Sequence, residues 1–339
     1  MERVWKDLMK AAIIGFVVPG ILLTVVLSMG ARGESPQETE PEPTEQTESI
    51  HTTAPPPSET TQPQPTPGTP VYHILVLTEE GIVEMELESY VLGVVLAEVP
   101  ASFEIEALKA QAVAARTAAL YICQSGRHAG AVCASFGCCQ AYISQANYFA
   151  IGGTQERLDR VQDAVIATVG QVMTYEGGLI CAAYFSCSGG STEDAVAVWG
   201  SDVPYLQAVE SPGEEFASVF ADCVTFTPEK FQQALCVRLE GEPATWFGEI
   251  TYTDGGGVAT LMVGDVAYRG TTLRILLGLR STFFTVSVTE GTIIIETRGY
   301  GHRVGMSQYG AQAMALAGSG YEEILCHYYQ GAGLSNYMA

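Results

Sequence analysis

The sequence predicts an α+β domain, in one lobe or two, that is exported and held at a membrane by the N-terminal part of the chain. Three observations lead to this prediction: one apolar run near the start, a Pro/Glu/Thr-rich stretch after it, and a remainder with helix and strand patterns in mixed order. The absence of a regular strand–helix rhythm argues against a doubly wound parallel sheet. Hydrophobic residues make up 47% of the chain, which is enough to build a core.

Residues 11–29 form an uncharged apolar run. Spanning a bilayer takes roughly 20 apolar residues, so this run is just long enough. Arg3, Lys6 and Lys10 precede it, and positive charge there favours a cytoplasmic N-terminus with the rest of the chain outside. A cleaved signal peptide is the alternative, although the run is long for one and the following residues make a poor cleavage site. We therefore expect residues 1–32 to be a cytoplasmic stub and a single-pass transmembrane anchor in the cell membrane.

Residues 33–70 differ completely in composition, being rich in Pro, Glu and Thr and nearly free of large apolar side chains. Such a segment buries too little surface to offset the entropy lost on ordering it, and its prolines keep it extended. We expect a linker that holds the globular domain, residues 71–339, away from the membrane.

The elements of this domain are predicted from hydrophobic spacing and from helix-ending residues. Pro100 ends a first, almost wholly apolar helix, and Ser102 is a candidate N-cap for the next one. In chain order we expect strands at 71–77 and 82–87, helices at 87–96, 103–123 and 156–168, strands at 171–175, 179–186, 250–253, 258–263, 271–278, 283–289 and 292–298, and helices at 308–316 and 321–329.

The formal net charge is -22, from 38 acidic and 16 basic residues. Such a surface repels phosphate backbones, so the charge argues against nucleic acid as a partner. A polyanionic substrate would have to be met by a few local cationic groups.

Nine cysteines are too few for a disulfide scaffold of this length, and the odd number leaves at least one thiol unpaired. Cys133, Cys138 and Cys139 lie close together in the sequence, just after His128. Thiolate and imidazole ligands suit zinc, so this loop is a candidate metal site. A disulfide between Cys133 and Cys139, or free thiols, are the alternatives.

Glu98 stands at the end of the first apolar helix. A lone carboxylate there loses solvation, which raises its pKa, and a raised pKa suits a general acid at neutral pH. The alternative is a helix-terminal glutamate that faces water.

Three segments carry a resemblance to a known family. They are residues 87–121, which contain the Ala-Glu-Val-Pro turn, residues 182–215, which begin AAYFSCSGG, and residues 297–315, with GYGHRVGMSQYGAQ. These segments closely resemble the stage II sporulation protein D family and occur in family order, and the resemblance covers roughly residues 72–332.

The resemblance implies a peptidoglycan lytic transglycosylase that cleaves the MurNAc–GlcNAc β-1,4 bond of denuded glycan strands and leaves a 1,6-anhydro end. It implies work during sporulation engulfment, between the mother cell and forespore membranes. The implied partners are an amidase of the stage II sporulation protein P type and a membrane protein of the stage II M type. No cofactor is expected for the chemistry. The same domain occurs in amidase enhancers, so a non-catalytic peptidoglycan-binding module is the main alternative, and a structural wall anchor is a third.

The resemblance also implies roles for particular residues. Glu98 matches the family's catalytic acid/base. Arg116 is a candidate for binding the lactyl carboxylate of MurNAc or for holding Glu98, unless it is a surface arginine of its helix. The remaining candidates for substrate contacts are polar residues in two glycine-rich turns, which are alternatively a structural turn and a helix cap. They are Tyr184, Ser186, Ser188, His302, Ser307 and Gln308.

Some members of this family hold zinc in a similar loop with one histidine and two cysteines. The resemblance assigns His128, Cys133 and Cys139 as ligands of a structural Zn²⁺, because the residues after Cys139 match the family better than those after Cys138. On this assignment water or substrate completes the coordination.

Overall fold

The computed structural model describes residues 71–78 and 81–337. The predicted anchor at 11–29 and the predicted linker at 33–70 lie outside these residues. Among residues 71–78 and 81–337, no helix is both long enough and apolar enough to cross a bilayer.

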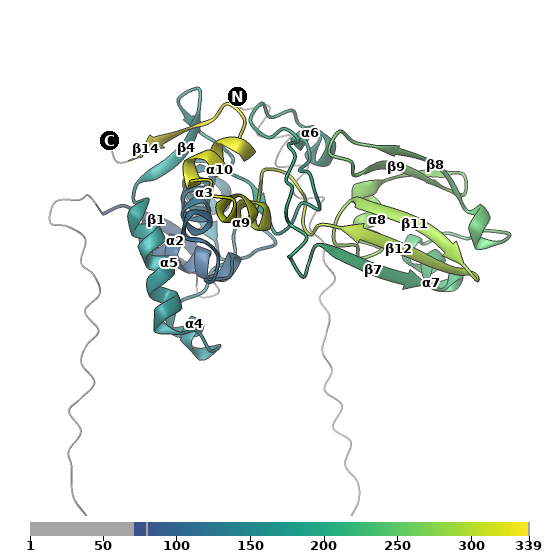
Figure 1. Ribbon diagram of the computed structural model, residues 1–339, viewed down its shortest axis with the longest axis horizontal. Helices are drawn as coiled ribbons and strands as arrows, with labels where there is room; N and C mark the ends of the chain where they lie inside the picture. Colours follow the sequence, from purple (N-terminus) through teal and green to yellow (C-terminus); the bar gives the residue numbers. More distant parts are fainter. Residues whose placement is uncertain (1–70, 79–80, 338–339) are drawn as a thin grey trace, which may run out of the picture. The chain divides into compact units, whose positions relative to one another are not determined.

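The described chain mixes helices and short strands (Figure 1). The α-helices are α2 (Leu87–Glu98), α3 (Ile105–Gln124), α4 (Gln145–Ala150), α5 (Gln155–Ala167), α6 (Ala195–Trp199), α7 (Pro228–Leu235), α8 (Gly270–Leu276), α9 (Gln308–Leu316) and α10 (Tyr321–Tyr328), with 3-10 turns η1 (Arg127–Gly130) and η2 (Pro243–Thr245). The strands are β1 (His73–Thr78), β2 (Gly81–Glu86), β3 (Ala131–Cys133), β4 (Gln171–Tyr175), β5 (Gly178–Leu179), β6 (Tyr184–Phe185), β7 (Ala221–Phe226), β8 (Phe247–Tyr252), β9 (Val258–Val263), β10 (Val266–Arg269), β11 (Phe283–Thr289), β12 (Thr292–Arg298), β13 (Met306–Ser307) and β14 (Gly333–Asn336).

The strands form small sheets rather than one large one. Their orders are β2-β1-β3, β14-β4-β5, β13-β6, β11-β12-β7 and β10-β9-β8. Two pairings are parallel: β3 beside β1, and β13 beside β6. The second of these joins two segments that carry predicted site residues, since Ser307 lies opposite Phe185.

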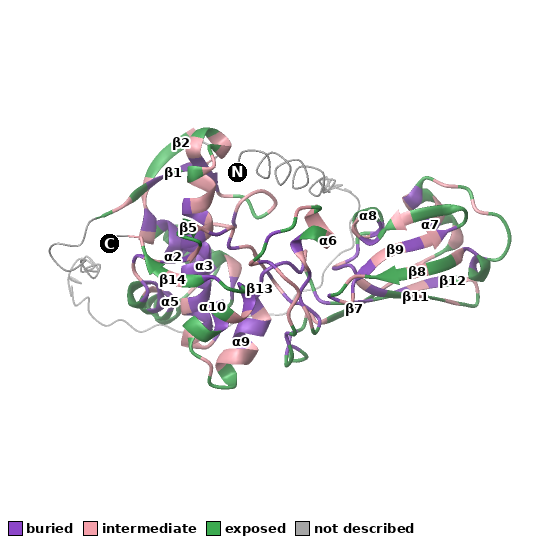
Figure 2. Cartoon of the chain, turned by 90° about the horizontal axis from the view of Figure 1, so that it is seen from above, coloured by how far each residue is buried: buried purple, intermediate pink, exposed green. Residues whose placement is uncertain are grey.

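The first hydrophobic core is built around α2 and α3. Buried residues lie all around α2, including Tyr90, Val91, Val94 and Val95, as expected of a helix enclosed by the protein. The alanines of α3 let α2, α5, α9 and α10 pack closely against it. Figure 2 shows both central helices coloured mostly as buried.

A second, separate core is formed by residues 221–298. Apolar side chains from β7, β9 and β12 pack with those of α7 and α8. Phe231 and Trp246 stack in it with ring centroids 6.3 Å apart. None of the candidate site residues belongs to this core.

The strongest helix predictions are confirmed. The helix expected at 103–123 is α3 and the one expected at 156–168 is α5. The strand expected at 271–278 is wrong, because Leu273 and Leu277, four residues apart, are both buried and the chain forms α8 there. The long strand expected at 179–186 is reduced to β5 and β6. Between them the backbone turns, because the N–H groups of Ala182 and Ala183 donate to the carbonyls two residues earlier, at 3.0 and 2.8 Å.

Candidate active site

Glu98 is the last residue of α2 and its side chain is partly buried. Its Oε1 accepts a hydrogen bond of 2.7 Å from the backbone N–H of Ala141. Its Oε2 accepts a longer one, of 3.4 Å, from the side-chain amide of Gln308 at the start of α9. Both donors are neutral, so the carboxylate is held in position without a salt bridge among these contacts.

Glycine at position 93 explains how Ala141 reaches Glu98. A Cβ on Gly93 would lie 2.3 Å from the ring of Tyr142, so only glycine leaves room for the segment that crosses α2 there. The N–H of Ile143 also donates to the Gly93 carbonyl, at 3.1 Å. These contacts fix residues 140–143 against the helix that ends at Glu98.

Burial raises the pKa of Glu98 above its ordinary value, because the charged form loses hydration. Hydrogen bonds from Ala141, Gln308 and Tyr184 oppose the shift, but the net direction is upward. A carboxyl group with a raised pKa keeps its proton to higher pH, which a general acid requires.

A chain of hydrogen bonds leads to Glu98 from the interior. The hydroxyl of Tyr90 donates to Gln140 Oε1 at 3.1 Å, and Gln140 Nε2 donates to the hydroxyl oxygen of Tyr184 at 3.1 Å. Because Tyr184 accepts from Gln140, its own proton is free to point to Glu98, to which it is hydrogen-bonded. Gln140 is buried and sets this direction.

His302 contacts the backbone of Tyr184, the neighbour of Glu98. Its ring packs between Phe185 and Trp199, at centroid distances of 5.5 and 5.4 Å. Its Nδ1 accepts from the N–H of Val304 at 3.1 Å, which leaves Nε2 to donate to the backbone of Tyr184. Burial lowers the pKa of His302 to about 4, so the ring is neutral at pH 7 and helps to position Tyr184.

The predicted role of Arg116 in substrate binding is wrong. The arginine is fully buried in α3, and its guanidinium forms a two-point ion pair with Glu88, with Nε–Oε1 and Nη2–Oε2 distances of 2.8 and 2.5 Å. Its Nη1 donates to the carbonyl of Gln171 at 3.1 Å. The alternative of a surface arginine is wrong as well, since Arg116 is fully buried.

The serines of the two glycine-rich turns have structural contacts. Ser188 is buried and donates to Glu214 at 2.7 Å, and Ser307 caps α9 by accepting from the N–H of Gly310 at 3.2 Å. Ser186 is partly buried, and its backbone carbonyl accepts a hydrogen bond of 3.0 Å from the N–H of Tyr309 in α9. Of the candidates in these turns, Tyr184 and Gln308 are thus the ones that contact Glu98.

The candidate metal loop assembles as a cluster. The ligand atoms of His128, Cys133, Cys138 and Cys139 all lie within 4.8 Å of one another. All nine cysteines are free, so the structure does not contain the alternative Cys133–Cys139 disulfide. The donor set, one imidazole and three sulfurs, is the kind that binds zinc.

Comparison with known proteins identifies the family. The stage II sporulation protein family model matches residues 78–175, which hold Glu98 and the whole metal loop. The chain is 41% identical over 273 residues to stage II sporulation protein D of Bacillus subtilis (strain 168), covering 78% of each chain. It is 40% identical to the protein of that name from Bacillus amyloliquefaciens, again over 78% of each.

The chain belongs to the stage II sporulation protein D family. This confirms the resemblance and assigns the protein to a family of sporulation proteins. It is also 31% identical over 304 residues to the amidase enhancer of Bacillus subtilis (strain 168), covering 72% of this chain and 40% of that one. The domain is therefore shared by relatives whose names point to different roles.

Several residues of this family member were missed by sequence reasoning. The backbone N–H of Ala141 donates to Glu98, and Gln140 donates to Tyr184 beside it. The signal in the sequence was the place of these two residues immediately after Cys139. A second missed group is the buried ion pair of Arg303 with Glu193, at 2.9 Å, and the buried carboxylate of Glu214. Arg303 also donates to the carbonyl of Ser188 at 2.8 Å, so this group fixes the turn that follows Tyr184.

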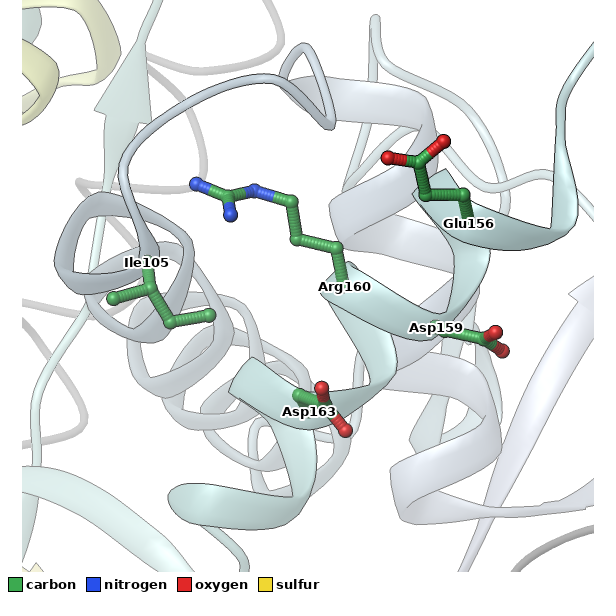
Figure 3. Close-up of a pocket in the computed structure, with 5 residues that line it drawn as sticks. All are labelled: Ile105, Glu156, Asp159, Arg160 and Asp163. Atoms are coloured by element: carbon green, nitrogen blue, oxygen red, sulfur yellow. The ribbon is translucent and has the colours of Figure 1, made fainter.

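A surface pocket lies elsewhere in the domain, between α5 and the start of α3 (Figure 3). Arg160 projects from α5 into it and donates to the carbonyl of Phe103 at 2.8 Å. The other charged groups of its lining are the carboxylates of Glu156, Asp159 and Asp163. An acidic lining disfavours an anionic glycan, and neither Glu98 nor any other candidate site residue of this family member lines the pocket.

Proposed function

We propose that this member of the stage II sporulation protein D family is a lytic transglycosylase that cleaves the MurNAc–GlcNAc β-1,4 bond of denuded peptidoglycan. The observation that carries the proposal is Glu98, a partly buried carboxyl group of raised pKa, held by neutral hydrogen-bond donors at the end of a buried helix. The position coincides with the family's Ala-Glu-Val-Pro turn.

A single carboxyl group suffices for this reaction. Ordinary glycosidases use one carboxyl group as the acid and another as base or nucleophile. In the transglycosylase, protonated Glu98 gives its proton to the leaving oxygen as the bond between that oxygen and C1 breaks. The 6-hydroxyl of the same sugar forms a new bond to C1 and gives its proton to the Glu98 carboxylate. The enzyme returns to its starting protonation state, and no water or cofactor is consumed.

The neighbours of Glu98 suit both halves of this cycle. A cationic partner would lower the pKa and keep the group ionised, which would prevent the first step. The contacts from Ala141, Gln308 and Tyr184 are instead neutral, so they stabilise the carboxylate between the steps without abolishing its proton affinity. Tyr184 and Gln308 also lie close enough to contact sugar hydroxyl or N-acetyl groups beside the acid.

We infer that zinc bound by the cysteine and histidine loop is structural. Residues 140 and 141, which follow the loop, contact Tyr184 and Glu98, so an ordered loop supports the acid's position. Bound zinc would hold the loop in one conformation and would take no part in the reaction. All proton transfers would be carried out by Glu98.

The cellular setting is part of the same proposal. We infer an N-terminal anchor in the cell membrane, an extended linker, and an exported domain between the mother cell and forespore membranes. The proposed partners are a stage II sporulation protein P-type amidase, which would supply glycan without stem peptides, and a stage II M-type membrane protein. Denuded glycan is anionic, so with a net charge of -22 the enzyme depends on local contacts rather than long-range attraction.

The second candidate function is stimulation of an amidase without catalysis. It is favoured by the 31% identity to the amidase enhancer. The two differ in one observable, since only the enzyme releases soluble products with a 1,6-anhydro end from glycan when no amidase is present.

The test is mass spectrometry of the products of the purified full chain on denuded glycan. The proposal expects anhydro-muramic products from wild type and none above background from Glu98→Gln. Glu156→Gln, the same change at an exposed glutamate on α5, is the matched control and should cleave normally. Glycan binding without products from wild type, with stimulation of an added amidase, would overturn the proposal in favour of the enhancer.

A further inference from the structure

The metal loop contains more sulfur than the assignment of three ligands uses. The Sγ of Cys138 lies 3.3 Å from Nε2 of His128. Zinc bonds of about 2.0–2.3 Å in tetrahedral geometry place neighbouring ligand atoms roughly 3.3–3.8 Å apart. The four ligand atoms, all within 4.8 Å of one another, therefore need to move by a few tenths of an ångström up to about one ångström to enclose an ion.

We propose that Cys138 is a fourth protein ligand, so that His128, Cys133, Cys138 and Cys139 form a closed Cys₃His zinc site. Such a site has no position for water or substrate, in contrast to the open coordination expected from the sequence. Closed four-ligand sites stabilise structure, whereas catalytic zinc keeps an exchangeable position. The proposal goes beyond the proposed function and does not depend on it.

The backbone is shaped to bring these side chains together. His128 and Ala129 both adopt the left-handed conformation, with φ of 49° and 60°, which costs free energy for residues other than glycine. Such a conformation persists where the surroundings require it, and here it turns Nε2 of His128 toward the sulfurs. A bond between the metal and Nε2 of His128 would offset the free-energy cost of this backbone conformation.

The adjacent cysteines are brought in by a separate turn. The backbone N–H groups of Cys138 and Cys139 both donate to the carbonyl of Ser135, at 3.0 and 2.9 Å. This turn folds the pair back toward Cys133, which is fixed at the end of β3 opposite Leu77 of β1. Both neighbouring cysteines thus reach the cluster, and neither is directed away from it.

The charge around Cys138 fits a ligand better than a bystander thiol. A zinc ion with three thiolates and a neutral imidazole carries a net charge of about −1. The guanidinium of Arg127 donates to Cys138 Sγ at 3.1 Å and supplies the opposite charge at that sulfur. Hydrogen bonds of this kind to ligand atoms are typical of metal sites. Soft sulfur donors also exclude magnesium and calcium as the resident ion.

The experiment is metal analysis and cobalt substitution of the purified full chain. Wild type should contain about one zinc per chain, and the cobalt form should have the visible bands of a tetrahedral ion with thiolate charge-transfer absorption. Cys138→Ser should lose about one third of that charge-transfer absorption, as one of three thiolates is removed. Its zinc affinity should fall by more than the roughly 10–100-fold typical of removing a group outside the ligand set. Cys123→Ser, at another partly buried cysteine outside the cluster, is the matched control and should change neither.

A second measurement needs no variant. Stripping the metal from wild type with a chelator should expose three additional thiols to a thiol reagent, and azide added to the cobalt form should leave its spectrum unchanged. Two additional thiols, an azide-sensitive spectrum, or a Cys138→Ser spectrum equal to wild type would overturn the closed site. Absence of bound metal after purification with zinc present would overturn it as well. None of these readouts uses glycan cleavage, so failure here and failure of the proposed enzyme activity are distinguishable.

Discussion

Replacing Glu88 by glutamine tests the assignment of Arg116 to structure rather than to substrate binding. The guanidinium of Arg116 is completely buried and the Glu88 side chain is 18% exposed. Glutamine preserves the size of the side chain but removes the charge. The guanidinium of Arg116 would then be buried without a counter-charge.

The expected cost can be worked out from these contacts. Removing one partner of a buried ion pair typically costs about 3–5 kcal/mol, because the other charge is left uncompensated. The lower end of about 3 kcal/mol applies here, because Glu88 keeps some solvent access and Arg116 retains its hydrogen bond to the Gln171 carbonyl. Replacing both residues by apolar ones of similar volume, Glu88→Leu with Arg116→Met, should recover most of that loss.

The assay is urea unfolding of the full chain followed by circular dichroism, together with KM for glycan cleavage. Glu88→Gln should lower the unfolding midpoint and leave KM unchanged. Asp222→Asn is the control, because it breaks a pair with Arg280 whose side chains are 27% and 33% exposed and should cost at most about 1 kcal/mol. Unchanged stability with a raised KM in Glu88→Gln would refute the reasoning and return Arg116 to the substrate site.

Four further predictions concern Glu98, its neighbour Tyr184 and the anchor. Glu98→Gln should lower kcat by roughly 10²–10⁴-fold or more, since it removes the proposed general acid/base. The raised pKa of Glu98 means that its contribution to stability is present at low pH and lost as the pH rises through that value, so urea unfolding of Glu98→Gln at pH 7 should show stability equal to or above wild type. Tyr184→Phe removes a hydrogen bond that lowers this pKa; activity falls as Glu98 deprotonates, so the alkaline limb of the kcat profile should move to higher pH, and a shift to lower pH would contradict the network. The full chain should sediment with membranes and a chain starting at Val71 should not, whereas a mature N-terminus near residues 30–33 would indicate a cleaved signal peptide.

The spacing of apolar residues correctly predicted the long helices, whose formation depends mainly on neighbouring residues in the sequence. The helix α3 could be recognised from apolar spacing alone, and Glu98 could be recognised as unusual from the apolar helix before it. The strand expected at 271–278 failed because its β-branched and apolar residues fit either structure, and burial of Leu273 and Leu277 decided for α8. Short apolar runs are ambiguous in this way until their neighbours in space are known.

Whether the polar candidate residues can bind substrate depends on partners that are distant in the sequence. Arg116 and Ser188 have the side chains expected of a sugar site, but Glu88 and Glu214 occupy them. Nothing in the spacing of these residues distinguishes a group that binds substrate from one that satisfies a buried carboxylate. The distinction is a matter of burial, and burial is a property of the completed fold.

The position of the Glu98 side chain also depends on tertiary contacts, and residues 139–143 make several of them. Cys139 at one end of this segment belongs to the metal cluster, and Tyr142 packs on α2 where Gly93 leaves room. Between them, Gln140 orients Tyr184 and the N–H of Ala141 donates to Glu98. Loss of the proposed zinc would release one end of the segment while Gly93 still holds the other. Activity should therefore decline less on metal removal than in Glu98→Gln, because the donors to the acid lose one of two supports and the acid itself remains.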